Sequence, residues 1–170
     1  MSQITQISQG GGGGAQAFIQ QVFNMDSQPV YLDNNVALPM SYSDTIPQSN
    51  QGVEVITVGI TPTDATNILC IRFEAFAAGG EEYATVALFQ DAGVNAIAAR
   101  NVDTRLIGSQ MLLTHFMTAG TLNPITFRIR YGVSTSMTGD TTTINGDSDL
   151  EMPVYGGVSS MVIYVQEMLP

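Results

Sequence analysis

Short runs in which apolar and polar residues alternate dominate this chain from Val53 to its end. In residues 69–75 every second position is apolar, and Arg72 and Glu74 stand between them. Residues 126–133 repeat the pattern, with Phe, Ile, Tyr and Val at alternate positions. Because successive side chains of a β-strand point to opposite faces, this period of two predicts strands that bury one face.

Eight runs rich in Val, Ile, Thr and aromatic residues are expected to form strands, and clusters of turn-forming residues separate them. The runs cover residues 53–60, 65–76, 82–90, 95–102, 107–117, 123–133, 140–146 and 157–168. No long helical pattern competes with them. The region is therefore predicted to be all-β, an antiparallel sandwich or jelly roll.

Residues 1–52 differ from the rest of the chain. They contain five consecutive glycines, Gly10 to Gly14, three prolines and many Gln, Asn and Ser residues, a composition that does not form a core of its own. A phosphate-binding glycine loop follows a strand and usually carries a lysine, which this chain lacks, so the glycines are interpreted as a hinge. We divide the chain into an extended N-terminal arm, residues 1–52, and a β domain, residues 53–170.

The arm nevertheless carries four large apolar residues at helical spacing, namely Phe18, Ile19, Val22 and Phe23. A free monomer would expose them as an apolar patch, which soluble proteins rarely tolerate. They are expected to anchor the arm on a partner. Deleting the arm is then expected to leave a folded β domain that no longer attaches.

Two of the predicted strands are apolar on both faces. In the last one, residues 161, 163 and 165 can fill the core, which leaves Val162 and Tyr164 facing outward. Residues 111–117 show the same property. One face of an antiparallel sheet is usually solvated, so a second dry contact is required. Self-association is one explanation, with Met117, Val162 and Tyr164 at the interface; coverage by the chain's own arm is the alternative.

The net charge of −10, with five arginines and no lysine, limits the partners. Nucleic-acid binding requires a basic surface, and an anionic membrane surface would repel this chain. No run approaches the ~20 apolar residues of a membrane span, and the N-terminus has no secretory signal pattern. The expected partners are proteins, glycans or further copies of the chain.

No constellation of residues predicts catalysis, a cofactor or a metal. His115 is the only histidine, and both it and the single cysteine, Cys70, lie within predicted strands. The pair Glu81–Glu82 is interpreted as a solvated turn. The strongest metal candidate is the cluster of Asp147, Asp149 and Glu151, because hard cations prefer carboxylate oxygens, but it lacks a complete calcium-loop pattern.

Several segments together resemble the C1q/TNF-like jelly roll, most closely the version at the ends of bacteriophage virion proteins. They are "ALFQDAGVNAIAA", "TTTING" and the closing "GGVSSMVIYVQE", within a likeness that covers residues 53–168. The glycine-rich leader is also similar to the starts of such proteins. The collagen-like stalk of the eukaryotic branch is missing, which argues against a signalling role.

The resemblance implies a homotrimer packed through one sheet, with the final strand near the threefold axis. It also implies a non-enzymatic virion protein, made in the host cytoplasm. Two roles fit: a capsid decoration or cement protein attached by its arm to the major capsid or tail proteins, or a short tail fibre or receptor-binding tip that contacts host surface glycans. A hydrolase would instead require a pair of acids in a cleft.

Overall fold

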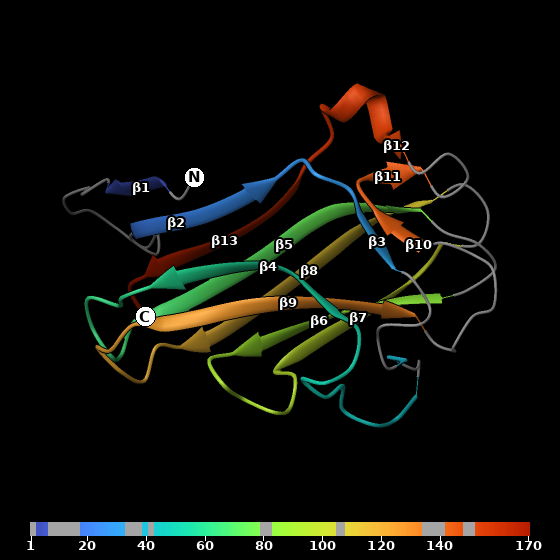
Figure 1. The fold of residues 1–170 in the computed structure, drawn as a ribbon. Coiled ribbons are helices and arrows are strands. Elements are labelled where there is room, and N and C mark those ends of the chain that lie inside the picture. The colour runs from blue at the N-terminus through green and yellow to red at the C-terminus, as the bar shows by residue number, and fades with distance from the viewer. Residues whose placement is uncertain are drawn as a thin grey trace.

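The computed structural model is all-β, and its strands pair antiparallel (Figure 1). The description covers residues 3–6, 18–32, 39–40, 43–78, 83–104, 108–133, 142–147 and 152–170. Within these residues one sheet has seven strands, a second has four, and a small hairpin pairs β11 (Gly146–Asp147) with β12 (Met152–Pro153). A 3-10 turn, η1 (Val154–Gly157), projects beyond the sheets.

The larger sheet is built around its longest strand, β5 (Ile68–Ala78). On one side β5 pairs with β8, and on the other it pairs first with β13 and then, at its end, with β10. Next to β13 and β10 lie β2 and β3, and β1 pairs with the free side of β2. The bounds are β1 Gln3–Gln6, β2 Phe18–Asp26, β3 Val30–Leu32, β8 Ser109–Thr118, β10 Thr142–Ile144 and β13 Met161–Met168.

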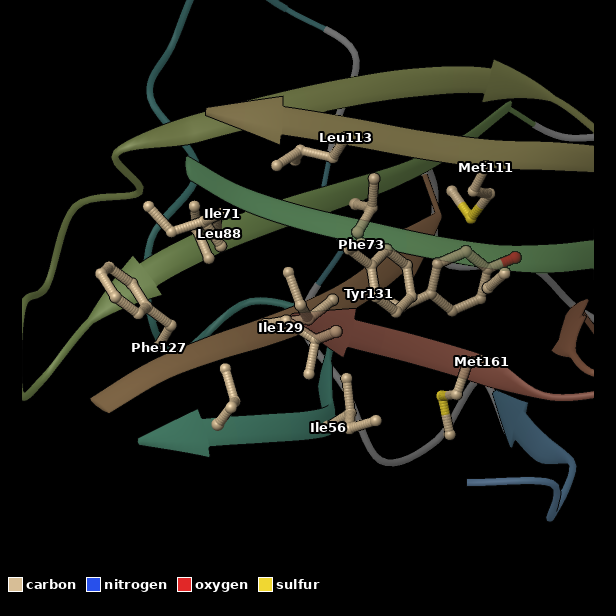
Figure 2. Close-up of a cluster of buried hydrophobic side chains, with 14 of the residues drawn as sticks. Ile56, Ile71, Phe73, Leu88, Met111, Leu113, Phe127, Ile129, Tyr131 and Met161 are labelled. Carbon is tan, nitrogen blue, oxygen red and sulfur yellow. The ribbon is translucent and has the colours of Figure 1, made fainter. Parts of the chain in front are cut away.

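The smaller sheet has the order β4-β9-β6-β7. Its strands are β4 (Val53–Ile60), β6 (Tyr83–Gln90), β7 (Ala98–Asp103) and β9 (Ile125–Val133). Side chains from the facing sides of the two sheets form one core, an arrangement compatible with a β-sandwich (Figure 2).

The alternation found in the sequence is confirmed in β5, β9 and β13, whereas β6 is buried on both of its faces. Each of the eight predicted runs contains one strand, and these are β4, β5, β6, β7, β8, β9, β10 and β13. Phe73 and Ile71 on β5 face Phe127, Ile129 and Tyr131 on β9 across the core, and all five are fully buried (Figure 2).

Residues 18–23 belong to strand β2, although their four large apolar residues stand at helical spacing. The sequence pattern did not predict this strand, because two of its inward-facing residues, Gln20 and Asn24, are polar. Gln20 donates a hydrogen bond to the Thr61 carbonyl oxygen (2.8 Å), and Asn24 donates one to the Thr57 carbonyl oxygen (2.9 Å). These bonds connect β2 to β4 and the loop after it, so polar contacts replace apolar packing at this margin of the core.

β2 pairs with β13 over its whole length. The described part of the expected arm is thus continuous with the body, and the boundary expected between residues 52 and 53 does not separate two units there. Residues 10–14, the glycine hinge, lie outside the described residues.

A second piece of the expected arm covers the outer face of the smaller sheet. Met40 is fully buried against Phe89 and Ala87, and its N–H donates to the Val133 carbonyl oxygen (2.8 Å). Gly132 permits this approach, because a Cβ atom at that position would lie 2.7 Å from the Cβ of Met40. For this sheet the chain itself supplies the dry contact.

Candidate interaction surface

On the outer face of the larger sheet, which also carries Cys70 and Phe76 of β5, six apolar side chains of the neighbouring strands form a set that no described segment covers in the way that Met40 covers the other sheet. We call this set the apolar face. Its members come from three strands and are Phe23 and Met25 on β2, Val162 and Tyr164 on β13, and Leu112 and Phe116 on β8.

The strand register aligns these residues across the sheet. One row runs Met25–Val162–Glu74–Leu112, and the next runs Phe23–Tyr164–Arg72–Thr114. Phe116 is 60% exposed, Met25 55% and Leu112 37%, while the other three are half-buried by their neighbours.

Charged groups occupy the middle of the apolar face. Arg72 Nε lies 3.1 Å from Glu74 Oε1, and both side chains are partly exposed. Such an exposed pair contributes little to the stability of the monomer. A partner that covers the apolar face would contact the charged groups of Arg72 and Glu74.

Two of the three predicted interface residues, Val162 and Tyr164, lie on the apolar face. Met117 does not, because it packs against the core from the inner side of β8. The residue beside it, Phe116, lies on the apolar face instead. The alternation of β8 could have revealed this, since Met111 and Leu113 are buried and share the parity of Met117.

The four predicted anchor residues do not form one patch. Val22 is a core residue, 4% exposed, opposite Val165 of β13. Phe23 lies next to Tyr164 on the apolar face. Phe18 and Ile19 are half-buried at the start of β2, where its register with β13 shifts.

A buried carboxylate that the sequence analysis did not single out closes one end of the sandwich. Glu167 of β13 has no exposed surface; its Oε1 accepts hydrogen bonds from the Thr63 N–H (2.8 Å) and Asn67 Nδ2 (2.7 Å), and its Oε2 accepts one from Gln20 Nε2. Burial by itself would raise the pKa of Glu167, but the bonds from Asn67, Gln20 and Thr63 outweigh it and hold the pKa below its usual value. Because both of its oxygens are buried and hydrogen-bonded to the protein, this carboxylate holds structure together.

The remaining titratable candidates lie apart. His115 is half-buried on β8, and burial lowers its pKa. Burial raises the pKa of Cys70 although Arg72 acts in the opposite direction, so the thiol stays protonated at neutral pH and is a weak nucleophile. In the described ranges no three His, Cys, Asp or Glu side chains gather as metal ligands. Asp149 and Glu151 lie outside these ranges, as do Glu81 and Glu82, and the side chain of Asp147 is not described.

Comparison with known proteins finds no protein-family model and no curated protein that matches the chain. Among the described residues no helix is long and apolar enough to cross a membrane.

Proposed function

We propose that this chain is a non-enzymatic structural protein of a bacteriophage virion, a C1q/TNF-like jelly roll that assembles as a homotrimer and decorates or cements the capsid. The observation that carries the proposal is the apolar face across β2, β13 and β8. Soluble monomers rarely leave large apolar patches in water, and here two of them, on β2–β13 and on β8, flank the Arg72–Glu74 pair; such surfaces commonly mark contacts between proteins.

The order of the strands supports the jelly roll. Among the eight long strands, the larger sheet contains β2-β13-β5-β8 and the smaller one β4-β9-β6-β7. Counted along the chain, the first of these eight strands (β2) pairs with the last (β13), and the third (β5) pairs with the sixth (β8). In the smaller sheet the second (β4) pairs with the seventh (β9), and the fourth (β6) pairs with the fifth (β7). Two interleaved Greek keys produce this order.

The composition of the apolar face supports self-association. Three of its residues are aromatic, a type that dominates the energetics of protein interfaces, and each large side chain that becomes fully buried contributes roughly 1.5–3 kcal/mol. The obligate interface of such a trimer buries about 2,000 Å² or more. The half-exposed Arg72 and Glu74 then find partners on the neighbouring copies.

Attachment to the particle is assigned to the residues that precede β2. Residues 18–26 pair with β13 and residues 3–6 pair with β2, so the anchoring role is assigned to the part of residues 1–17 outside β1. Three such arms from one trimer add avidity, because each further contact forms at the effective concentration set by the first.

The test starts with the oligomeric state. Phe116→Asp and Tyr164→Asp each place a carboxylate in the proposed contact, where burial without a partner costs several kcal/mol. Sedimentation is expected to show a trimer for the unchanged chain and monomers for both variants. Val94→Asp is the matched control, because Val94 is 62% exposed in the loop between β6 and β7 of the smaller sheet, and it should remain trimeric.

The same proteins are then added to particles assembled without this chain. The unchanged chain and the control are expected to fill threefold sites on the capsid in cryo-electron microscopy maps. A stable monomer of the unchanged chain would overturn the trimer, and binding of all variants at the tail would overturn the decoration role.

A second role, receptor binding, is favoured by one observation. Tyr155 in η1 is 80% exposed and has a positive φ of 52°, which is costly for a non-glycine residue, and Val158 beside it is 83% exposed. An exposed aromatic loop of this kind suits contact with a host surface glycan. In that case Tyr155→Ser would abolish binding to host cells and leave binding to the particle unchanged.

A further inference from the structure

A groove of about 490 Å³ lies on the other side of the sandwich, between residues 43–47 and β7. Its volume falls within the ~300–1,000 Å³ typical of small-molecule sites. Thr85 and Asn101 lie opposite each other on β6 and β7, and they face the groove together with Ala99. The groove is therefore remote from the apolar face and stays open when that face is covered.

Hydrogen bonds fix the wall of the groove in place. The Ala96 N–H donates to the Pro47 carbonyl oxygen (2.9 Å), and the Ser49 N–H donates to the Val94 carbonyl oxygen (2.8 Å). Gln48 Nε2 also donates to Asn95 Oδ1 (2.9 Å). Because the wall is tied to the segment that leads into β7, the groove exists before any ligand arrives, and little ordering is needed on binding.

The polar groups along the groove are hydroxyls, an amide and one carboxylate. Ser43 Oγ and Thr45 Oγ1 are 2.7 Å apart, and Asp44 stands between them in the chain. Asn101 Nδ2 donates to Thr85 Oγ1 (3.1 Å), which leaves its second N–H and its carbonyl oxygen without a partner among the described residues. Small side chains such as Ala99 leave room above this floor.

The charge of the groove selects against anions. Arg100 is the only cationic residue along it, and it pairs with Val86, whose side chain is in the core. Strand alternation therefore directs the Arg100 side chain away from the face that carries Asn101. Asp44 and the net charge of the chain both repel a negative ligand.

We propose that this groove binds a neutral saccharide unit. Sugar hydroxyls donate to the carboxylate of Asp44 and to Asn101 Oδ1, and they accept from the Asn101 amide and from the hydroxyls of Ser43 and Thr45. Such paired donors and acceptors, in a preformed groove whose one described cationic side chain, Arg100, is directed away from Asn101, match a pyranose better than an anion. The inference does not rest on the virion role or on the trimer.

Saturation-transfer NMR with the full-length chain tests the inference. The probes are methyl α-glucoside, methyl β-galactoside, methyl α-mannoside and N-acetylglucosamine, with galacturonic acid as an anionic counterpart of galactose. At least one neutral probe is expected to bind saturably and to shift the backbone amides of Thr85 and Asn101. Asn101→Ala should weaken that binding about 3- to 10-fold, the loss of one or two hydrogen bonds.

Two further variants make the outcome decisive. Ala99→Leu narrows the groove at an exposed position and should abolish binding without a change in melting temperature. Asn123→Ala, in an exposed loop outside the groove, should leave binding unchanged. The proposal would be overturned if no neutral probe bound saturably, or if galacturonic acid bound more tightly than methyl β-galactoside. It would also be overturned if Asn101→Ala and Ala99→Leu bound the probe as tightly as the unchanged chain does.

Discussion

At the residue scale, Glu167 links three segments that are far apart in the sequence. It belongs to the last strand, and it accepts hydrogen bonds from β2 and from the loop between β4 and β5. Its pKa lies below the ordinary value of 4.5, so the folded state binds the proton more weakly than the unfolded chain does. Its contribution to stability is therefore complete above about pH 4.5 and is lost as the pH falls through the lowered pKa.

Glu167→Gln is expected to lower the free energy of unfolding by about 1–3 kcal/mol at pH 7, because the new amide meets the Gln20 amide and leaves a buried donor unpaired. The difference between the two proteins should shrink below pH 4.5. Urea unfolding monitored by circular dichroism at several pH values measures both effects. Glu54→Gln is the control, since its partly exposed pair with Arg128 should contribute 1 kcal/mol or less. A difference that does not change with pH would contradict the role of the ionised carboxylate.

At the element scale, the sequence was sufficient for strands that follow the rule of apolar inside and polar outside. β5 and β9 follow it, and the alternation located both. β2 inverts the rule, because Gln20 and Asn24 point inward and Phe23 and Met25 outward. The inward amides of β2 find partners on β4, in the loop after it and on β13, and such long-range pairs cannot be seen in one sequence. The buried role of Glu167 could not be predicted for the same reason, since its hydrogen-bond partners are also distant in the sequence.

The role of β2 predicts how truncations behave. Deleting residues 1–17 should leave a folded chain, because β2 keeps its pairing with β13. Deleting residues 1–26 should give an aggregating or strongly destabilised chain, since it removes Val22 from the core and Gln20 from Glu167, and it exposes the edge of β13. This reverses the expectation that residues 53–170 fold alone. Thermal melting of the two truncated chains decides the matter, and equal melting temperatures would show that β2 is dispensable.

At the scale of the whole molecule, the two outer faces of the sandwich differ in how they are covered. Met40 covers part of one, and no segment within the described ranges covers the apolar side chains of the other. The strands that are apolar on both faces predicted a second dry contact, made either by the arm or by another copy of the chain. It could not assign them to sheets, because that assignment depends on the path of residues 39–52 across the smaller sheet.

Closing the apolar face in a trimer brings together three chains that each carry a net charge of −10, and their mutual repulsion opposes assembly. Salt should therefore strengthen the trimer: the screening length falls from about 30 Å at 0.01 M to about 8 Å at 0.15 M. We expect the association constant from sedimentation equilibrium to rise about threefold or more over this range. The double variant Asp44→Asn/Asp64→Asn removes two exposed charges away from the apolar face and should reduce the dependence on salt. If salt instead dissociates the trimer, ion pairs from Arg72 and Glu74 across the interface outweigh the repulsion, and the apolar contact is not its main support.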